Sequence, residues 1–411
     1  MSVNFEELKQ LLAKTFTPRT PVSERDLFAG RIDQFDSVAG VISERGAHGV
    51  IFGERGVGKT SLANVVQSLV EVDEVKVMSL KVTCETSDTF STIWHKAFSQ
   101  ITIPVVTTGI GFDKNDKTTT KSLGASLPAS IDASFVTNVL SQLSQSQKCL
   151  VILDEFDRLS DGTTVRSMAD RVKTLSAIFS EATLLIVGVA DSIDQLIESH
   201  ESTERAFVQI PMPRMSAAEI LQIIVNGCKR LTMACDEEVT QQIVALSQGL
   251  PYITHLLCSH IFRQALNRKS VVVEEDDFNE GLRKALDQWQ ASIKTSYVSA
   301  VTSVQPQHIF KEVLLACAFA KTDELGYFSA SAVRAPLQNI TERTYDIPNF
   351  ARHLKEFASS NRGNIIERTG PPKRLRYRFN NPLMRPYVIL KSVADGLIAM
   401  SEVDVISSAV S

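Results

Sequence analysis

The segment that most constrains this chain is a glycine-rich loop between a short apolar run and a helix-like segment. The apolar run at 49–52 predicts a buried strand, and residues 61–66 predict the start of a helix. A strand, such a loop and a helix in this order are typical of a phosphate-binding loop, whereas a glycine-rich turn that matches by chance would not need these flanks. The loop consists of Gly53, Glu54, Arg55, Gly56, Val57, Gly58, Lys59 and Thr60.

The loop predicts a site for the phosphates of a nucleotide. Its glycines let backbone amides turn toward a phosphate, and the helix start adds the positive end of its dipole. We expect Lys59 to reach the β- and γ-phosphates and the Thr60 hydroxyl to bind Mg²⁺. Ser61, in the first turn of the helix, completes the predicted nucleotide-binding set of residues 53–61.

A second motif supplies two acids. The apolar run 149–153 predicts a strand, and Asp154 and Glu155 follow it directly. Ligands bind at the carboxyl ends of parallel strands, so we expect Asp154 to hold Mg²⁺, directly or through water. Glu155 is expected to polarise the water that attacks the γ-phosphate. An acidic helix cap is the alternative, but the phosphate loop upstream favours the catalytic interpretation, in which the nucleotide is hydrolysed.

Bulk properties exclude several classes of protein. The 411 residues are enough for two or three domains, and the net charge of −4 means that any nucleic-acid surface is local. The six cysteines form no CxxC pair, which predicts reduced core residues in a cytoplasmic protein. The first residues lack a basic, apolar leader, and no apolar run approaches the ~20 residues that span a bilayer, so no membrane association is expected.

The order of elements divides the first half of the chain. Residues 1–25 predict a helical arm, and residues 26–212 alternate strand-like runs with helical stretches, which predicts a parallel sheet covered by helices. Residues 103–132, rich in Thr, Gly and Ser, predict an inserted loop or hairpin; a plain surface excursion is favoured over a contact element for a partner or neighbouring subunit. The strand-like runs are 48–52, 75–83, 148–153, 183–189 and 206–210.

The second half changes character twice. Residues 213–298 predict an all-helical lid with helices at 216–231, 236–248, 251–267 and 277–298. Residues 299–391 predict a winged helix, because helical patterns precede two strand-like runs separated by a turn at 369–372. Residues 392–411 are a loose tail or a docking helix. In the winged helix the expected helices are 307–320, 329–340 and 348–360, and the expected strands are 364–368 and 374–379.

Together these motifs resemble AAA+ ATPases of the initiator clade (origin-recognition proteins) and the related STAND signalling ATPases, over about residues 26–390. The acids at 154–157 resemble the initiator acid motif. Residues 27–34 resemble the Gly-Arg box, which implies that Gly30 and Arg31 line the adenine pocket. Residues 186–192 resemble the sensor-1 strand, which implies that Asp191 or Ser192 lies near the γ-phosphate, although family members usually carry Asn, Ser or Thr there.

Two more segments bear on the resemblance. Residues 200–214 resemble the box that supplies an arginine finger, which implies that Arg205 reaches the nucleotide of a neighbouring subunit and that the ATPase core self-associates; a surface arginine paired with a nearby glutamate is the alternative. The arginine sensor of initiators is absent near 249–252, where a Gly-x-Pro resembles the STAND motif and implies that Pro251 packs on the nucleotide. His255 shares its helical face, as a phosphate sensor or, the favoured alternative, a packing residue.

The predicted hairpin at the end of the winged helix is basic. Residues 361–391 hold eight lysines and arginines against one acid. Alternation along the second strand places its arginines on one face and Leu375, Tyr377 and Phe379 on the other. Such a surface predicts salt-dependent contacts with duplex DNA, whereas the STAND resemblance implies internal packing and subunit contacts. The candidate contact residues are Lys373, Arg374, Arg376 and Arg378.

The sequence therefore predicts an α/β P-loop NTPase core, AAA+-like, with a helical lid and a C-terminal winged-helix domain. ATP and Mg²⁺ are the expected ligands, and ATP hydrolysis, expected to be slow, is the predicted reaction. The predicted function is a switch that assembles or changes shape with nucleotide state and regulates a separate effector protein, with bacterial antiviral defence as its setting. The alternative is an ATP-dependent DNA-binding initiator, loader or transposition-type regulator. Glu155 argues against a scaffold without turnover.

Overall fold

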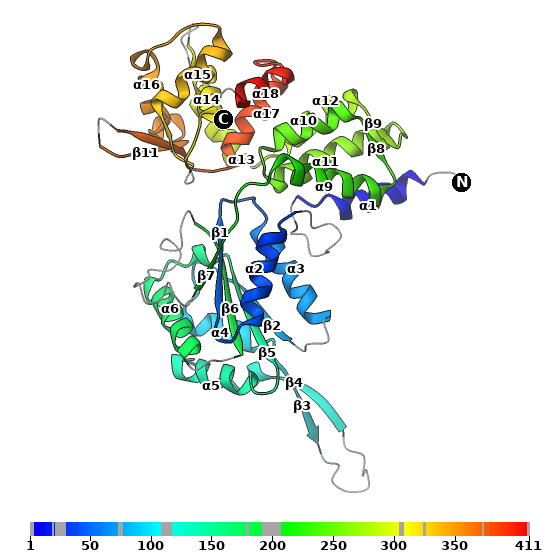
Figure 1. The fold of residues 1–411 in the computed structure, drawn as a ribbon, viewed down its shortest axis with the longest axis vertical. Coiled ribbons are helices and arrows are strands. Elements are labelled where there is room, and N and C mark those ends of the chain that lie inside the picture. Colours follow the sequence, from blue (N-terminus) through cyan, green and yellow to red (C-terminus); the bar gives the residue numbers. More distant parts are fainter. Residues whose placement is uncertain are drawn as a thin grey trace. The chain divides into compact units, whose positions relative to one another are not determined.

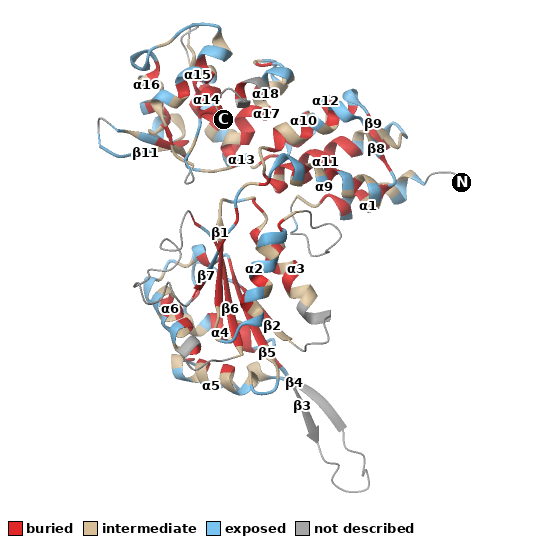
Figure 2. Cartoon of the chain, viewed as in Figure 1, coloured by how far each residue is buried: buried red, intermediate tan, exposed pale blue. Residues whose placement is uncertain are grey.

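The computed structural model describes residues 4–18, 20, 30–72, 77–107, 117–177, 181–190, 207–303, 308–323, 326–371 and 374–408. They divide into two compact units (Figure 1). Each unit has its own buried interior, drawn in red in Figure 2. We call the unit made of Pro21–Glu54 and Gly58–Pro213 the core unit, and the unit made of Met1–Thr20, Arg55–Val57 and Arg214–Ser411 the helical unit.

A five-stranded parallel sheet forms the centre of the core unit, with strand order β2-β5-β6-β1-β7. All five predicted strands are present, each within two residues of its expected bounds. Because the strands are parallel, their carboxyl ends meet at one edge of the sheet, and this brings the ends of β1 and β5 to the same edge. The strands are β1 (His48–Gly53), β2 (Val77–Thr83), β5 (Lys148–Asp154), β6 (Ala182–Val189) and β7 (Phe207–Pro211).

Helices cover both faces of this sheet, because its central strands carry buried side chains on both sides. Val151 and Ile186 point into the cluster that includes Trp94, Phe98 and Val172, which belong to the helices on that face. In the central strands β1, β5 and β6 most of the alternate residues are also buried, so these strands are apolar on both sides, as in other covered parallel sheets. The helical elements are α2 (Ile32–Ser43), α3 (Lys59–Val72), α4 (Phe90–Phe98), η2 (Leu123–Ser126), α5 (Ala133–Leu143), η3 (Phe156–Arg158) and α6 (Gly162–Ala177).

The predicted insertion is a hairpin. Strands β3 (Thr102–Thr107) and β4 (Lys117–Ser122) pair antiparallel from Thr102 opposite Ser122 to Thr107 opposite Lys117. Within the core unit the hairpin extends away from the parallel sheet (Figure 1). At the end of the hairpin nearest the sheet, the Ser122 hydroxyl donates a hydrogen bond to the Ser99 carbonyl oxygen at 2.7 Å.

From Arg214 on, the helical unit continues with the helices α9 to α13, and the sequence prediction of this region needs two corrections. The region is not wholly helical, because β8 (Ala234–Cys235) and β9 (Val272–Val273) form a parallel pair too short to leave a period in the sequence. The helix expected at 277–298 is two helices, separated around the buried Trp289, whose ring lies 5.4 Å from that of Tyr387. The helices are α9 (Ala217–Leu231), α10 (Glu237–Ser247), α11 (Pro251–Asn267), α12 (Glu275–Asp287) and α13 (Ala291–Val301).

The N-terminal arm is part of the helical unit. Its helix α1 (Phe5–Thr15) packs on α9 and α11, although these follow far along the chain. Phe16 is buried, with its ring 5.2 Å from the ring of Phe262. Gly227 on α9 makes room for it: a Cβ at this glycine would lie 2.1 Å from Phe16 Cζ. The apolar side of the amphipathic arm is therefore the side that packs on α9 and α11.

The C-terminal part of the helical unit follows the predicted order of helices and a hairpin, with one strand that the sequence did not indicate. Strand β10 (Phe328–Ser329) pairs antiparallel with β12, giving a sheet of order β10-β12-β11. Within the segment predicted as a loose tail or a docking helix, residues 400–408 are helical, and their Val403 and Ile406 are buried against the helical unit. The other elements are α14 (Phe310–Phe319), α15 (Ala330–Thr341), α16 (Ile347–Phe357), η4 (Ser360–Arg362), β11 (Ile366–Thr369), β12 (Arg376–Phe379), α17 (Met384–Ala394) and α18 (Met400–Ser408). No helix among the described residues is long and apolar enough to cross a membrane.

Candidate phosphate-binding site

The glycine-rich loop connects the end of β1 to the start of α3, as the sequence predicts. Its glycines have backbone angles that other residues rarely adopt, with φ of 148° at Gly53, 90° at Gly56 and 98° at Gly58. At Gly53 space is limiting as well, because a Cβ there would lie 2.5 Å from the Met212 carbonyl oxygen. The loop can therefore take this path only with glycine at these positions.

Lys59 is the first residue of α3, and its side chain folds back under the loop. Its Nζ donates to the carbonyl oxygens of Gly53 at 2.9 Å and Glu54 at 2.7 Å. The residue is 8% exposed, so a largely buried cation is held within the loop that leads into α3. A buried ammonium beside a helix N-terminus is a combination that favours an anion such as a phosphate.

The two predicted motifs meet at the edge of the sheet. The Thr60 hydroxyl donates to Asp154 Oδ1 at 3.2 Å, although the residues are 94 positions apart. Asp154 is 3% exposed, and the backbone N–H of Glu155 also donates to its Oδ1, at 3.0 Å. A hydroxyl and a carboxylate are oxygen donors of the kind that Mg²⁺ prefers, so these residues fit the predicted metal.

Glu155 lies at the mouth of this arrangement and not inside it. Its φ is 54°, which is unusual for a residue other than glycine and marks a bend directly after the strand. Its Oε2 accepts a hydrogen bond from Arg158 Nη1 at 2.7 Å, and both side chains are about half exposed. The carboxylate is therefore accessible to water, and Arg158 is a partner that the sequence analysis did not identify.

Two further residues at this edge make contacts that were not predicted. Lys81 on β2 places its Nζ 3.0 Å from Asp154 Oδ2 and also donates to Asn64 Oδ1 on α3. Asp157, which the sequence analysis placed only within the acid motif, accepts the backbone N–H of Val189 at 2.7 Å and so fixes the end of β6. A lysine between Leu80 and Val82 of a largely apolar strand was the sequence signal for Lys81.

The Gly-Arg box lies at the start of α2. Gly30 and Arg31 both have positive φ, 65° and 62°. Arg31 is 3% exposed, and its guanidinium donates to the Pro213 carbonyl oxygen after β7. The box is thus a tightly held turn, and its predicted contact with adenine stays a prediction. Asp191, Ser192, Arg205 and Lys373 lie outside the described residues.

His255 is packed inside the helical unit, on α11. Its Nδ1 accepts the backbone N–H of Thr17 at 3.2 Å, and its ring contacts Phe16 edge-on with centroids 5.9 Å apart. Burial lowers the pKa of His255 to about 4, so the imidazole is neutral near pH 7. These contacts favour the packing interpretation over phosphate sensing. Pro251, at the first turn of the same helix, is buried as well.

The basic hairpin has the predicted alternation, since Tyr377 is buried and Arg376 is exposed. Two of its arginines, however, are paired with acids. Arg376 contacts Asp323 and Arg378 contacts Glu367, each at 2.8 Å. Both guanidinium groups lie over the Tyr327 ring, at 4.9 and 4.5 Å from its centroid, and the Tyr327 hydroxyl donates to Glu367 at 2.6 Å. Within the part of the chain that the structure describes, Arg368 and Arg374 are exposed and form no ion pair.

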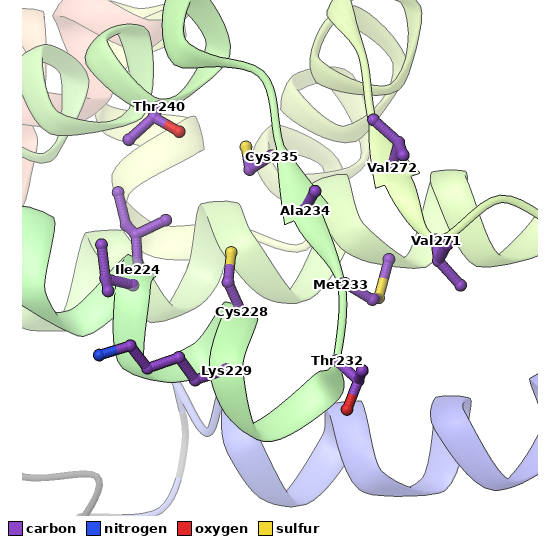
Figure 3. Close-up of a pocket in the computed structure, with 11 residues that line it drawn as sticks. Ile224, Cys228, Lys229, Thr232, Met233, Ala234, Cys235, Thr240, Val271 and Val272 are labelled. Atoms are coloured by element: carbon purple, nitrogen blue, oxygen red, sulfur yellow. The ribbon is translucent and has the colours of Figure 1, made fainter.

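A groove in the helical unit is distinct from all predicted site residues (Figure 3). It has a volume of about 620 Å³, and its lining is mostly apolar, with Lys229 as the single charged residue. It therefore lacks the cluster of polar groups that a nucleotide site needs. The lining residues are Ile224, Val225, Cys228, Lys229, Thr232, Met233, Ala234, Cys235, Thr240, Val271 and Val272.

Comparison with known proteins agrees with this geometry. Residues 42–197 match the family described as "AAA domain". The chain is similar to the Walker-type ATPase PABY2304 of Pyrococcus abyssi, at 13% identity over 90% of this chain and 99% of that one, with a TM-score of 0.53. It also matches the ORC2 protein of Aeropyrum pernix (16% identity, 95% and 99% covered, TM-score 0.48) and CDC6P of Pyrobaculum aerophilum (14%, 95% and 98%, 0.47). No curated protein matches the sequence. At such identities the likeness to PABY2304 establishes the fold.

Proposed function

We propose that the chain is a nucleotide-driven switch, because its residues 42–197 are a P-loop AAA+ ATPase domain, which binds ATP with Mg²⁺ and hydrolyses it. The observation that supports this most directly is the meeting of Thr60 and Asp154, whose oxygens lie 3.2 Å apart at the edge of the sheet. A metal-binding hydroxyl and carboxylate beside a phosphate loop are the parts that ATP hydrolysis requires.

Each residue of the site has a proposed role. Lys59 binds the phosphates, and Thr60 and Asp154 hold Mg²⁺, which neutralises charge on the phosphate oxygens when it is bound. Glu155 accepts a hydrogen bond from the attacking water and orients it. To do so its carboxylate leaves Arg158, which costs little because both side chains are about half exposed.

The test is the substitution Glu155→Gln, which keeps the shape of the side chain and removes its negative charge. We expect ATP affinity to stay within about twofold and the hydrolysis rate to fall at least about a hundredfold, since a general base contributes 10²–10⁴. Arg158→Ala is the matched control and should hydrolyse ATP at least as fast as the unaltered protein. Normal turnover in Glu155→Gln would exclude the catalytic role.

The switch itself requires that ATP and ADP favour different states. We propose that self-association through the core unit is the state that ATP favours, with Arg205 as the finger. The Glu155→Gln protein should then form a larger species with ATP than with ADP in sedimentation velocity, and Arg205→Ala should remove this difference. An unchanged sedimentation coefficient in both nucleotides would argue for a monomeric switch.

For the partner of the switch, duplex DNA has the better support. The element order α14, β10, α15, α16, β11, β12 supports the proposal of a winged helix in which β11 and β12 form the wing. Because Arg376 and Arg378 are already paired, the proposed phosphate contacts are the exposed Arg368 and Arg374.

This is tested with a labelled duplex, with ATP and then ADP, across a salt series. Each phosphate contact contributes about 0.9 to the slope of log affinity against log salt, so Arg368→Gln with Arg374→Gln should reduce the slope by about two. Asp323→Asn, which frees Arg376, is the control and should not weaken binding. Failure to bind at low salt in either nucleotide would leave the wing a structural element.

A separate effector protein is the second candidate, and the β3–β4 hairpin is the feature that favours it. The hairpin adds nothing to the parallel sheet and extends away from it (Figure 1). Replacing residues 103–121 by a short Gly-Ser turn should leave ATP hydrolysis unchanged while abolishing regulation of such a partner. Loss of ATPase activity in this variant would instead give the hairpin a role in the core unit.

A further inference from the structure

We propose that Lys81 weakens Mg²⁺ binding at the candidate site when no nucleotide is present, and so makes tight metal binding depend on ATP. This inference rests on the proposed role of Asp154 as a metal ligand. It concerns a residue that belongs neither to the glycine-rich loop nor to the acid motif.

Thr60 and Lys81 contact different oxygens of the Asp154 carboxylate. Oδ1 accepts hydrogen bonds from the Thr60 hydroxyl and the Glu155 N–H, whereas Oδ2 lies 3.0 Å from Lys81 Nζ. Asp154 is nearly buried and the Lys81 side chain is 18% exposed, so water screens this pair only in part. The negative charge that would attract a metal is thus already opposed by a cation of the protein.

Several contacts hold Lys81 in this place. Its Nζ donates to Asn64 Oδ1, which lies on α3 one turn after Thr60. Its strand β2 is the outermost strand of the sheet. On the unpaired side of β2, the Gln100 side chain accepts the Lys81 backbone N–H at 3.1 Å and donates to the Lys81 carbonyl oxygen at 2.9 Å. A lysine fixed in this way cannot move aside as freely as one on the surface.

The consequence follows from charge. A divalent cation at Asp154 is attracted by that carboxylate and repelled by the Lys81 ammonium beside it, so Lys81 lowers the attraction that Asp154 offers to the metal. The phosphates of ATP add several negative charges on the opposite side of the metal and outweigh one lysine. Metal and nucleotide would therefore bind together, and Lys81 is a positioning residue that acts through Asp154.

The experiment measures metal binding directly. Free Mn²⁺, a paramagnetic substitute for Mg²⁺, is measured by electron paramagnetic resonance in a titration of the nucleotide-free 411-residue chain. We expect Lys81→Met to bind Mn²⁺ at least about tenfold more tightly than the unaltered protein, and Lys81→Arg, which keeps the charge, to remain within about twofold of it. In a parallel Mg²⁺ series, binding of a fluorescent ADP by Lys81→Met should reach its half-maximum at correspondingly less Mg²⁺.

The controls separate the possible failures. Lys148→Met removes a lysine from the other end of β5, where it contacts Glu181 at 3.9 Å, and should change neither titration. If Asp154→Asn leaves the Mg²⁺ dependence intact, the metal-binding role of Asp154 is wrong. If Asp154→Asn abolishes that dependence but Lys81→Met binds Mn²⁺ no more tightly, or more weakly, the inference about Lys81 is wrong. Should Lys81→Met fail to fold, Lys81→Gln retains a donor for Asp154 and is held to the same expectation.

Discussion

The phosphate site of the core unit and the charged or polar groups of the helical unit differ in what they contact. In the core unit, Lys59, Thr60 and Asp154 gather at one edge of the sheet, as a ligand site requires. In the helical unit, two of the side chains with predicted ligand roles instead contact neighbouring residues of the same unit. His255 accepts a backbone N–H from the arm, and Arg376 pairs with an acid.

The difference teaches where sequence motifs are informative. The phosphate loop is a run of eight contiguous residues, and the positions of its glycines predict the backbone geometry of the site. A basic strand contains no such information, because its charges can be neutralised by residues from elsewhere. Asp323 lies 53 positions before Arg376, and no local pattern connects the two. Counting charges over 361–391 therefore overestimated the positive surface of the hairpin.

The largest expected effect separates these two kinds of residue. Lys59→Ala removes the only buried ammonium of the loop, so affinity for a fluorescent ATP analogue should fall at least about a hundredfold, since hydrogen bonds from charged groups to phosphate are strong. Thermal stability without nucleotide should change little. His255→Gln is the contrasting variant, and we expect it to keep its nucleotide affinity within about twofold. A large loss of affinity in His255→Gln would restore its role as a sensor.

The next effect tests whether the arm is part of the helical unit. In Gly227→Ala the new methyl group would lie 2.1 Å from the present position of Phe16 Cζ, so Phe16 must leave its pocket. Losing the burial of a phenylalanine costs about 3 kcal/mol of unfolding free energy, measurable by urea denaturation. The double variant Gly227→Ala with Phe16→Leu has a smaller side chain at position 16 and should recover part of this loss. An unchanged stability in Gly227→Ala would mean that the arm contributes little to the unit.

A third effect depends on pH and involves one histidine from each unit. Burial lowers the pKa of both His48 and His255 to about 4, below the ~6.5 of an unfolded chain. As pH falls, the unfolded chain takes up a proton before the folded one, so stability is fully present above about pH 6.5 and is lost progressively toward pH 4. At pH 5 each histidine should cost about 2 kcal/mol of unfolding free energy relative to pH 7.

Urea denaturation at pH 7 and pH 5 measures this loss. His255→Gln should reduce the pH dependence by the share of one histidine and leave that of His48. An unchanged difference between the two pH values in His255→Gln would show that His255 is not buried in a neutral form.

Much of the fold was predictable, and what was missed shares a cause. The five strands of the core and the hairpin insertion follow from apolar periodicity and composition, which act locally. Strands β8, β9 and β10 have two residues each, too few for a period. In the site, the loop and the acid pair were predictable because each is contiguous. Lys81 and Arg158 were not, because their partners are chosen by the register of neighbouring strands and by the bend at Glu155.

The smallest expected effect concerns the paired arginines. In a double-mutant cycle of Arg376→Ala and Asp323→Ala, the coupling should be only about 0.5 kcal/mol, because the side chains are 50% and 39% exposed and water screens the pair. It should shrink further between 0.1 and 1 M salt. A coupling well above 1 kcal/mol would mean that the stack on Tyr327 makes the hairpin a rigid structural element. If the coupling is near zero and Asp323→Ala strengthens the binding of duplex DNA, Asp323 only masks Arg376. Arg376 would then be a ligand-binding residue like those of the core unit, but one whose availability Asp323 controls.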